Sequence, residues 1–232
     1  MVIAATYSDL IGRGSILEPR VCCPYKPDLA RVKLSKSGEY DEDQIAALVD
    51  RPQTIADVVA RWKELGGGQR TVAFAASVEH SQHIATAFLE AGIPAEHLDG
   101  TTDPDIRRDM LKRLENGTTL VLANYGVLTE GWDCPECAVC ILARPTTSLA
   151  LYMQMVGRVL RPKTLSQAAP LVLDFAGSVL RHGWPTADRE WTLADREIKR
   201  KGAGAGDEEE EPSVAFCPAC LFARPSSMAH EP

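Results

Sequence analysis

Residues 154–161 read Gln-Met-Val-Gly-Arg-Val-Leu-Arg, with two arginines, Arg158 and Arg161, shortly after a glutamine and a glycine. If this stretch is helical, Gln154, Arg158 and Arg161 project together, because residues three and four apart share one face of a helix. Two guanidinium groups on one face suit a polyphosphate, since each is permanently charged and forked for bidentate contacts with phosphate oxygens. A solvated basic surface is the alternative interpretation of an isolated Arg-x-x-Arg pair.

A second motif lies upstream, in residues 118–135. It contains a short apolar run, residues 120–123, which is typical of a buried parallel strand. A polar turn then leads to Glu-Gly-Trp-Asp at residues 130–133. Gly131 indicates a backbone with positive φ or close approach to a neighbour. Asp133 is either a functional carboxylate or one that caps the turn.

A third motif begins with residues 71–77, an apolar run that ends in Ser77 and precedes His80. A strand that ends in a small polar residue and opens a helix is the usual arrangement for binding phosphate at a helix N-terminus. Residues 82–91 have the apolar period of that helix, and Gly92 follows as a helix stop.

A polar turn of similar form follows at residues 98–102, which read Leu-Asp-Gly-Thr-Thr. The next helix is predicted over roughly 104–115, with Pro104 in a favourable first-turn position. Arg107 and Arg108 lie near its start. Either of them contacts phosphate, or both belong to an ordinary charged surface.

The order and spacing of these motifs resemble the C-terminal RecA-like domain of superfamily-two DEAD/DEAH-box helicases of the phage and bacterial type. Residues 154–161 are similar to motif VI of that family, 118–135 to motifs V and Va, and 71–81 to motif IV. The resemblance covers roughly residues 15–183. It implies an α/β fold in which helices cover both faces of a parallel sheet. It also implies an ATP-dependent helicase or translocase that acts on DNA or RNA.

The resemblance assigns roles to individual residues. Arg158 and Arg161 would be the catalytic arginines, which stabilise charge on the transferred γ-phosphoryl group. The residues of the nucleotide site would be Gln154, Gly131, Asp133 and Gly157. The nucleic-acid backbone would be contacted by Ser77, His80, Gly100, Thr101, Arg107 and Asn124. Asn124 stands where the family often has threonine.

The sequence contains no Gly-Lys-Ser or Gly-Lys-Thr, and therefore no phosphate-cradling loop of the Walker type. The acidic residues 41–43 do not close an apolar strand, as a metal-binding DExx box does, and they are better interpreted as the first turn of a helix. ATP and Mg²⁺ are therefore expected to be held mainly by an N-terminal RecA-like ATPase domain outside this chain, and the isolated chain is expected to be inactive. The alternative is a non-catalytic fragment or a module that binds nucleic acid or a protein partner.

The chain has 232 residues and a formal charge of −7, and five acids lie together in residues 207–211. This acidic run follows a Gly-Ala linker, so the total charge does not decide whether nucleic acid binds. We expect three segments: 1–20 as the remnant of a preceding domain and its linker, 21–183 as the RecA-like domain, and 184–232 as a flexible tail. No window of eighteen apolar residues occurs, which argues against a membrane partner and for a cytoplasmic protein.

The seven cysteines need separate interpretations. Cys134, Cys137 and Cys140 have a spacing that suggests metal. However, Cys140 falls in the apolar run 138–142, which is expected to be a buried strand, and should pack there as a small hydrophobic residue. Cys217 and Cys220 form a knuckle of the zinc-ribbon type, which is half of a site, so zinc is expected only in a longer form. Separately, Asp174 ends the last predicted strand, 169–174, and is either a functional carboxylate or a buried cap.

Overall fold

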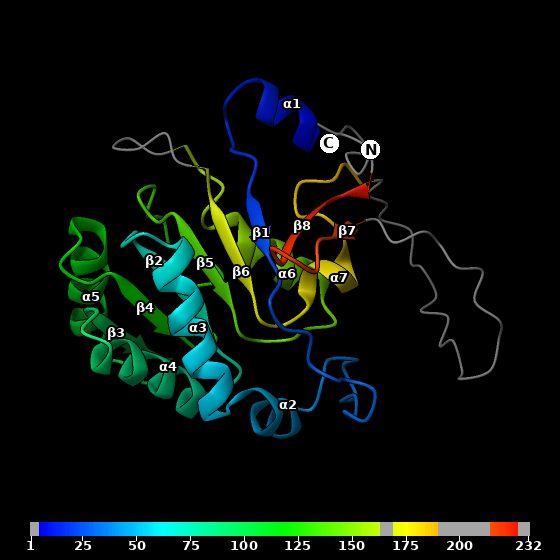
Figure 1. Cartoon of the computed structure of the whole chain (residues 1–232). Coiled ribbons are helices and arrows are strands. Elements are labelled where there is room, and N and C mark those ends of the chain that lie inside the picture. Colours follow the sequence, from blue (N-terminus) through cyan, green and yellow to red (C-terminus); the bar gives the residue numbers. More distant parts are fainter. Residues whose placement is uncertain (1–4, 163–168, 190–213, 227–232) are drawn as a thin grey trace.

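The computed structural model describes residues 5–162, 169–189 and 214–226. Its centre is a sheet in the order β3-β4-β2-β5-β6-β1-β8-β7, shown in Figure 1. The first six strands in this order are parallel, and β8 and β7 are antiparallel additions next to β1. The strands are β1 (Arg20–Cys22), β2 (Thr71–Phe74), β3 (Ala95–Leu98), β4 (Val121–Asn124), β5 (Val139–Leu142), β6 (Leu171–Asp174), β7 (Val214–Phe216) and β8 (Phe222–Pro225).

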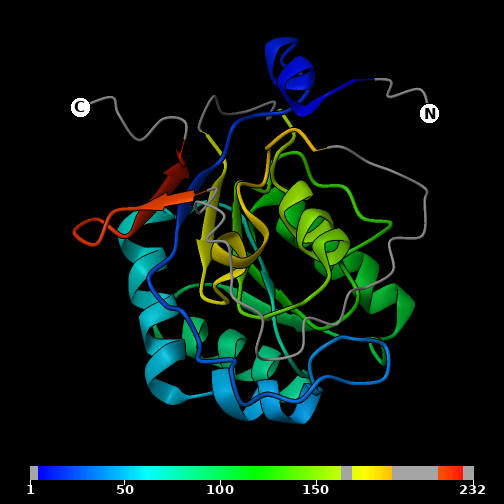
Figure 2. The same cartoon turned by 90° about the vertical axis from the view of Figure 1, so that its right-hand side faces the viewer.

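Helices cover both faces of this sheet, as the sequence predicts. The helices are α1 (Tyr7–Gly12), α2 (Glu42–Val49), α3 (Pro52–Leu65), α4 (Val78–Glu90), α5 (Pro104–Asn116), α6 (Leu149–Gly157) and α7 (Ser178–His182). One apolar cluster joins α3 and α4 to one face, and a second joins α5, α6 and α7 to the other. Figure 2 shows α3 and α6 on opposite sides of the sheet. No helix among the described residues has the length and apolar character that a membrane crossing requires.

The central strands are buried because their side chains alternate between the two clusters. In β5, Val139 and Ile141 pack with α3 and α4, whereas Cys140 and Leu142 pack with the opposite helices. A strand that is covered on both faces needs apolar side chains at every position. This requirement explains the continuous apolar runs that predict β4 and β5.

Local sequence signals set most helix ends. The Ser77 side chain caps α4, Pro104 is the first residue of α5, and the Asp41 side chain caps α2. Gly92, just after α4, has a φ of 78°. These predictions are confirmed, and the acidic residues 41–43 indeed belong to a helix start.

The end of α6 differs from the prediction, because the helix stops at Gly157 and does not extend to Arg161. The N–H of Arg158 bonds to the Met155 carbonyl, and the next N–H bonds in the same i−3 pattern, which tightens the last turn. Two residues of the sequence explain this end. Glycine weakens a helix, and Pro162 disfavours helical backbone at the residue before it.

The two ends of the described chain also differ from the prediction. Arg20, expected at the end of the 1–20 segment, is already the first residue of β1 (Arg20–Cys22), where Val21 and Cys22 are fully buried. Residues 214–225, expected in a flexible tail, form a hairpin that pairs with β1. Apolar residues at 21–23 favour a buried strand, and the hairpin then covers an otherwise open sheet edge. The acidic run 207–211 lies outside the described residues.

Candidate functional site

Side chains from the end of α6 converge on the loop between β4 and β5. Gln154 Nε2 donates to Glu130 Oε1 at 3.1 Å. Arg161 forms an ion pair with Asp133. The sequence predicts that these side chains act together, and they do meet at one loop, although Arg161 reaches it from beyond the helix.

Arg158 is bound to the backbone of the same loop. Its Nη2 donates to the Thr129 carbonyl at 2.7 Å, and its Nη1 donates to the Trp132 carbonyl at 2.5 Å. Its Nε is buried and has no hydrogen-bond partner among the described residues. Burial lowers the pKa of Arg158 and the charge of Glu130 raises it, but an arginine remains protonated at neutral pH. Arg158 therefore holds the shape of the loop.

Arg161 pairs with Asp133 at a more exposed position. The exposed fractions of its side chain and of the Asp133 side chain are 38% and 62%. An ion pair at this exposure contributes about 0–1 kcal/mol, because water and salt screen it. The ion pair with Asp133 by itself therefore contributes little to the stability of the loop.

Gly131 directs the neighbouring side chains to opposite sides. Its φ of 68° confirms the predicted positive value. Trp132 packs into the core cluster at 6% exposure, whereas Asp133 faces solvent. Gly157 does not have a positive φ, and a Cβ atom at this position would meet nothing within 4 Å. The space beside the end of α6 is open.

Three of the predicted nucleic-acid contacts lie at the carboxyl ends of β2 and β3. Ser77 Oγ accepts a hydrogen bond from the His80 N–H at 3.0 Å. Thr101 donates to Asp99 Oδ1 through both its N–H and its hydroxyl, at 2.7 Å each, and these bonds hold the pKa of Asp99 at about 2. Gly100, which lies between Asp99 and Thr101, is exposed. This turn is therefore organised before any ligand arrives.

His80 and Asn124 lie in the interior and not on the accessible surface that a contact with nucleic acid requires. Burial lowers the pKa of His80 to about 4, and its Nδ1 accepts from the Ala76 N–H at 3.3 Å. Asn124 donates to the Ala73 carbonyl at 2.9 Å and accepts from the Leu128 N–H at 3.1 Å. Both side chains satisfy backbone groups at the strand ends, where regular pairing stops.

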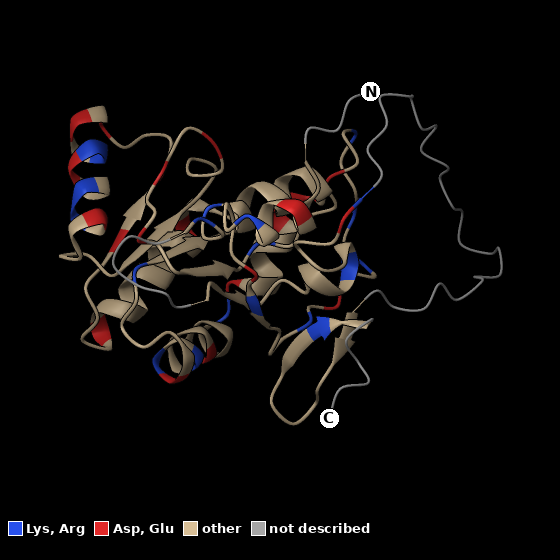
Figure 3. Ribbon diagram, turned by 90° about the horizontal axis from the view of Figure 1, so that it is seen from above, with Lys and Arg blue, Asp and Glu red and all other residues tan. Residues whose placement is uncertain are grey.

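The two predicted arginines at the start of α5 differ. Arg107 Nη2 donates to the Val127 carbonyl at 3.4 Å, so it lies beside the loop after β4. Arg108 pairs with Asp105 on the surface. Figure 3 shows both charge signs along the outer side of α5. The surface interpretation fits Arg108.

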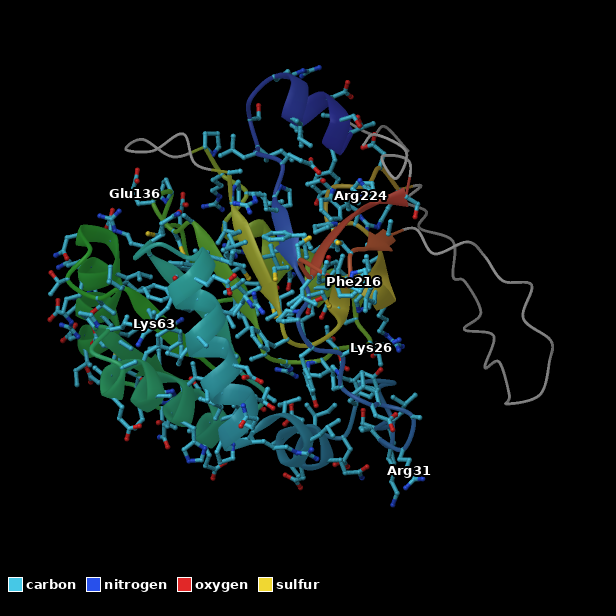
Figure 4. The ribbon with its side chains drawn as sticks, in the orientation of Figure 1. Lys26, Arg31, Lys63, Glu136, Phe216 and Arg224 are labelled. Atoms are coloured by element: carbon cyan, nitrogen blue, oxygen red, sulfur yellow. The ribbon has the colours of Figure 1, made fainter. Side chains whose placement is uncertain are left out.

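The predicted nucleic-acid contacts and the arginines that contact the 129–133 loop lie at opposite ends of the parallel strands. Gly100 and Ser77 follow the carboxyl ends of their strands, whereas Leu160 accepts a hydrogen bond from the N–H of Leu17, before β1 begins. Figure 4 shows Glu136 beyond one end of the strands, with Lys26 and Arg31 near the other end. The loop from Asn124 to Asp133 runs from the carboxyl end of β4 to the arginines at the opposite end of the strands.

Asp174, for which the sequence left two interpretations, is a buried cap. Its carboxylate accepts from the N–H groups of Ala176 and Val179 at 3.1 and 2.8 Å, and it has no exposed surface. Burial raises its pKa to about 6. A different carboxylate, Glu130, was not among the predicted site residues, and it contacts Gln154. Its place inside the Thr-Glu-Gly-Trp-Asp stretch was the available signal.

The cysteines of the first group are hydrophobic core residues. Cys134, Cys137 and Cys140 are all buried. Cys217 and Cys220 are exposed in the turn between β7 and β8, where hydrogen bonds from the turn backbone lower the pKa of Cys217. Among the described residues there is no group of three or more His, Cys, Asp or Glu that suits a metal ion.

Comparisons with known proteins agree with this architecture. Residues 51–163 match the family described as helicase conserved C-terminal domain. A "51.5 kDa protein" of Lactococcus phage (isolate 7-9) is 34% identical over 164 residues, which cover 71% of this chain and 35% of the phage protein. The Schizosaccharomyces pombe protein named "Putative mitochondrial ATP-dependent helicase irc3" is 32% identical over 177 residues, with 75% of this chain and 29% of that protein covered.

One solved structure shares the fold over most of the chain. It is the fragment of a "putative HsdR subunit of a type I restriction enzyme" from Vibrio vulnificus YJ016, with a TM-score of 0.63, 20% identity, and coverage of 79% of this chain and 37% of that chain. The fold is thus an α/β domain of the RecA-like type. The chain carries a superfamily-two helicase C-terminal domain. It spans about a third of the length of the two relatives, 35% and 29%.

Proposed function

We propose that the chain is the C-terminal motor domain of an ATP-dependent helicase or translocase that acts on DNA or RNA. An N-terminal RecA-like ATPase domain would hold most of the ATP and the Mg²⁺. The observation that carries the proposal is the convergence of Gln154, Arg158 and Arg161 on one loop, residues 129–133. The printed name of the fission yeast relative, an ATP-dependent helicase, supports it.

The residues at this loop fit a polyphosphate. Gly157 leaves open space beside the end of α6, and the side chains of Arg158 and Arg161 both reach the loop that follows β4. Bound ATP supplies the phosphoryl group that is transferred to water. The chain supplies positive charge through Arg161, and Arg158 keeps the loop in the shape that positions Asp133.

The same loop provides a route for coupling to nucleic acid. It begins at Asn124, whose side chain ties β4 to β2 and to the N–H of Leu128. Arg107 contacts it at Val127, and Arg158 contacts it further along. A shift at the strand ends, where nucleic acid would bind, is therefore transmitted through bonded backbone to the arginines.

The test uses the complete two-domain motor. Arg161→Ala should lower kcat by roughly 10³–10⁵, or about 4–7 kcal/mol, with a much smaller change in ATP affinity, because a finger meets charge that develops mainly in the transition state. Arg161→Lys should restore little, since lysine lacks the planar fork. Arg108→Ala is the matched control, because Arg108 is an exposed arginine in a surface pair. Hydrolysis within a few-fold of wild type for Arg161→Ala would overturn the proposed role.

The absence of a Walker-type loop from the sequence favours a second candidate, a non-catalytic module that binds nucleic acid or a protein partner. The two candidates differ in the response to an added ATPase domain. A motor domain stimulates hydrolysis by its partner, whereas a binding module leaves that rate unchanged.

A further inference from the structure

A cavity of about 630 Å³ lies at the carboxyl ends of β1, β5 and β6, outside the loop described above. It is lined by residues 26–30 after β1, by Pro145 and Thr146 after β5, and by residues 176–178, 180 and 181 after β6, together with Tyr40. In parallel sheets, ligands bind beyond the carboxyl ends of the strands. The volume lies within the range of about 300–1,000 Å³ that is usual for small-molecule sites.

The rim of the cavity carries two cations. Lys26 is exposed, and Arg181 Nη1 donates to the Tyr40 hydroxyl at 2.9 Å. The guanidinium carbon of Arg181 also lies 5.5 Å from the centre of the Tyr40 ring, which fixes its direction. That hydrogen bond uses one of the five N–H donors of a guanidinium. Asp28 is the acid in the lining, so the two cations outnumber it.

A buried hydroxyl in the lining lacks a partner. Ser178 is 2% exposed, and its Oγ makes no hydrogen bond to any described residue. A buried polar group without a partner destabilises the folded chain, because it has lost its hydrogen bonds to water. Such a group beside a cavity points to a ligand that completes its bonding.

The remaining walls are apolar. They come from Pro27, Leu29, Pro145, Ala176 and Leu180. A ligand that suits both parts of the cavity has a flat, weakly polar body and an anionic group. A nucleotide, with its base and its phosphate, has this combination.

We propose that this cavity binds one nucleotide, with the phosphate at Lys26 and Arg181 and the base against the apolar wall. This inference rests on the proposed function, because it extends the path of nucleic acid along the carboxyl ends of the strands, where Ser77 lies. In the sheet order, β5 and β6 follow β2 directly. With neighbouring strands about 4.8 Å apart, a bound single strand at Ser77 is within about 10–15 Å of the cavity. Lys26 lies near the carboxyl ends of the strands in Figure 4.

The experiment measures binding of a labelled oligo(dT) and of dTMP to the full chain. Lys26→Gln should weaken oligonucleotide binding several-fold and reduce its salt dependence by about one phosphate contact. Lys36→Gln is the matched control, because Lys36 is exposed in the same segment and outside the cavity. It should bind as wild type does.

Ser178→Ala separates a binding role from a structural one. Loss of a hydroxyl without a partner should leave the melting temperature of the free chain equal or higher, while the affinity for the nucleotide falls. Wild-type affinity in Lys26→Gln and Ser178→Ala for both probes would overturn the proposal. Competition by inorganic phosphate as strong as by dTMP would overturn the contact with a base.

The results also show whether the nucleotide is free or part of a strand. They further show whether the cavity proposal or the motor proposal fails. Effects on both probes support a nucleotide within a strand, and effects on dTMP alone support a free nucleotide. If oligo(dT) binds and the cavity variants have no effect on either probe, the cavity proposal fails while the motor proposal stands. The motor proposal fails separately, through the Arg161→Ala measurement in the two-domain enzyme.

Discussion

Arg158 and Arg161 are three residues apart in the sequence, but their surroundings give them different properties. Arg158 is partly buried and donates to two backbone carbonyls, whereas Arg161 has an exposed ion pair with Asp133. Hydrogen bonds from a charged group to partly buried carbonyls contribute more than a screened surface pair. The Arg158–carbonyl contacts should therefore contribute more to stability than the Arg161–Asp133 ion pair does.

We expect Arg158→Ala to lower the free energy of unfolding by about 1–3 kcal/mol, because two carbonyls of the 129–133 loop lose their donors. Asp133→Asn, which removes the exposed ion pair with Arg161, should lower it by less than about 1 kcal/mol. Urea unfolding of the isolated chain, followed by circular dichroism, measures both values. Equal losses would contradict the difference in roles.

His80 gives a prediction for the pH dependence of stability. Burial lowers its pKa in the folded chain to about 4, below the ordinary value of 6.5. Between these values the unfolded chain binds more protons, so folding stability falls as the pH falls below 6.5. From pH 6.5 to 5 the expected loss is up to about 2 kcal/mol.

The measurement compares wild type with His80→Gln across that range. The variant should lose less stability on acidification, because it lacks the imidazole. Asp174, whose folded pKa is raised to about 6, contributes the opposite slope, but it does so in both chains. Parallel curves for the two proteins would refute the assignment to His80.

At the scale of elements, the β7–β8 hairpin is the addition that the sequence analysis did not expect. It pairs with β1 through Val21 and Cys22, and it presents Cys217 and Cys220 at its exposed turn. The turn resembles half of a zinc site. A complete tetrahedral site requires four ligands.

The isolated chain should therefore bind zinc only weakly. Two thiolates leave half of the coordination sphere to water, and zinc that is held in this way is removed by a chelator. Metal analysis after gel filtration with EDTA should show zinc well below one per chain. Stoichiometric zinc that survives the chelator would mean that other residues of the chain complete the site.

At the scale of the whole molecule, the predicted site residues are divided between the two ends of the parallel strands. The turns after β2 and β3 lie at the carboxyl ends, and Arg161 lies near the segment that enters β1. A single loop, residues 124–133, joins the two regions. In the proposed motor, the domain would supply charge and contacts to a nucleotide, and its sequence has no Walker-type loop to cradle the β- and γ-phosphates.

The isolated chain is accordingly expected to show no ATP hydrolysis above background, with or without DNA or RNA. The measurement is a coupled ATPase assay with the purified 232-residue protein and an excess of single-stranded nucleic acid. Hydrolysis that nucleic acid stimulates in this protein alone would contradict the proposed division of the motor into two domains.

Local patterns in the sequence were sufficient to predict the elements that carry the site. Apolar runs predicted β4 and β5, because strands covered on both faces need apolar residues throughout. Ser77 and Pro104 predicted the starts of α4 and α5, because capping and a fixed φ act within one turn of helix. Gly157 and Pro162 also signalled the end of α6 locally, although the helical spacing of the arginines suggested a longer helix.

Tertiary structure alone decided which groups these elements bring together. The pairing of β8 with β1 joins residues about 200 positions apart, and no local pattern specifies such a contact. The interior places of His80 and Asn124 depend on backbone groups of neighbouring segments. The same holds for Arg158, whose partners are two carbonyls of the loop after β4. The sequence therefore determined which residue types are present at the site, whereas packing determined which of them remain accessible, because burial and hydrogen bonding depend on the neighbours that the fold supplies.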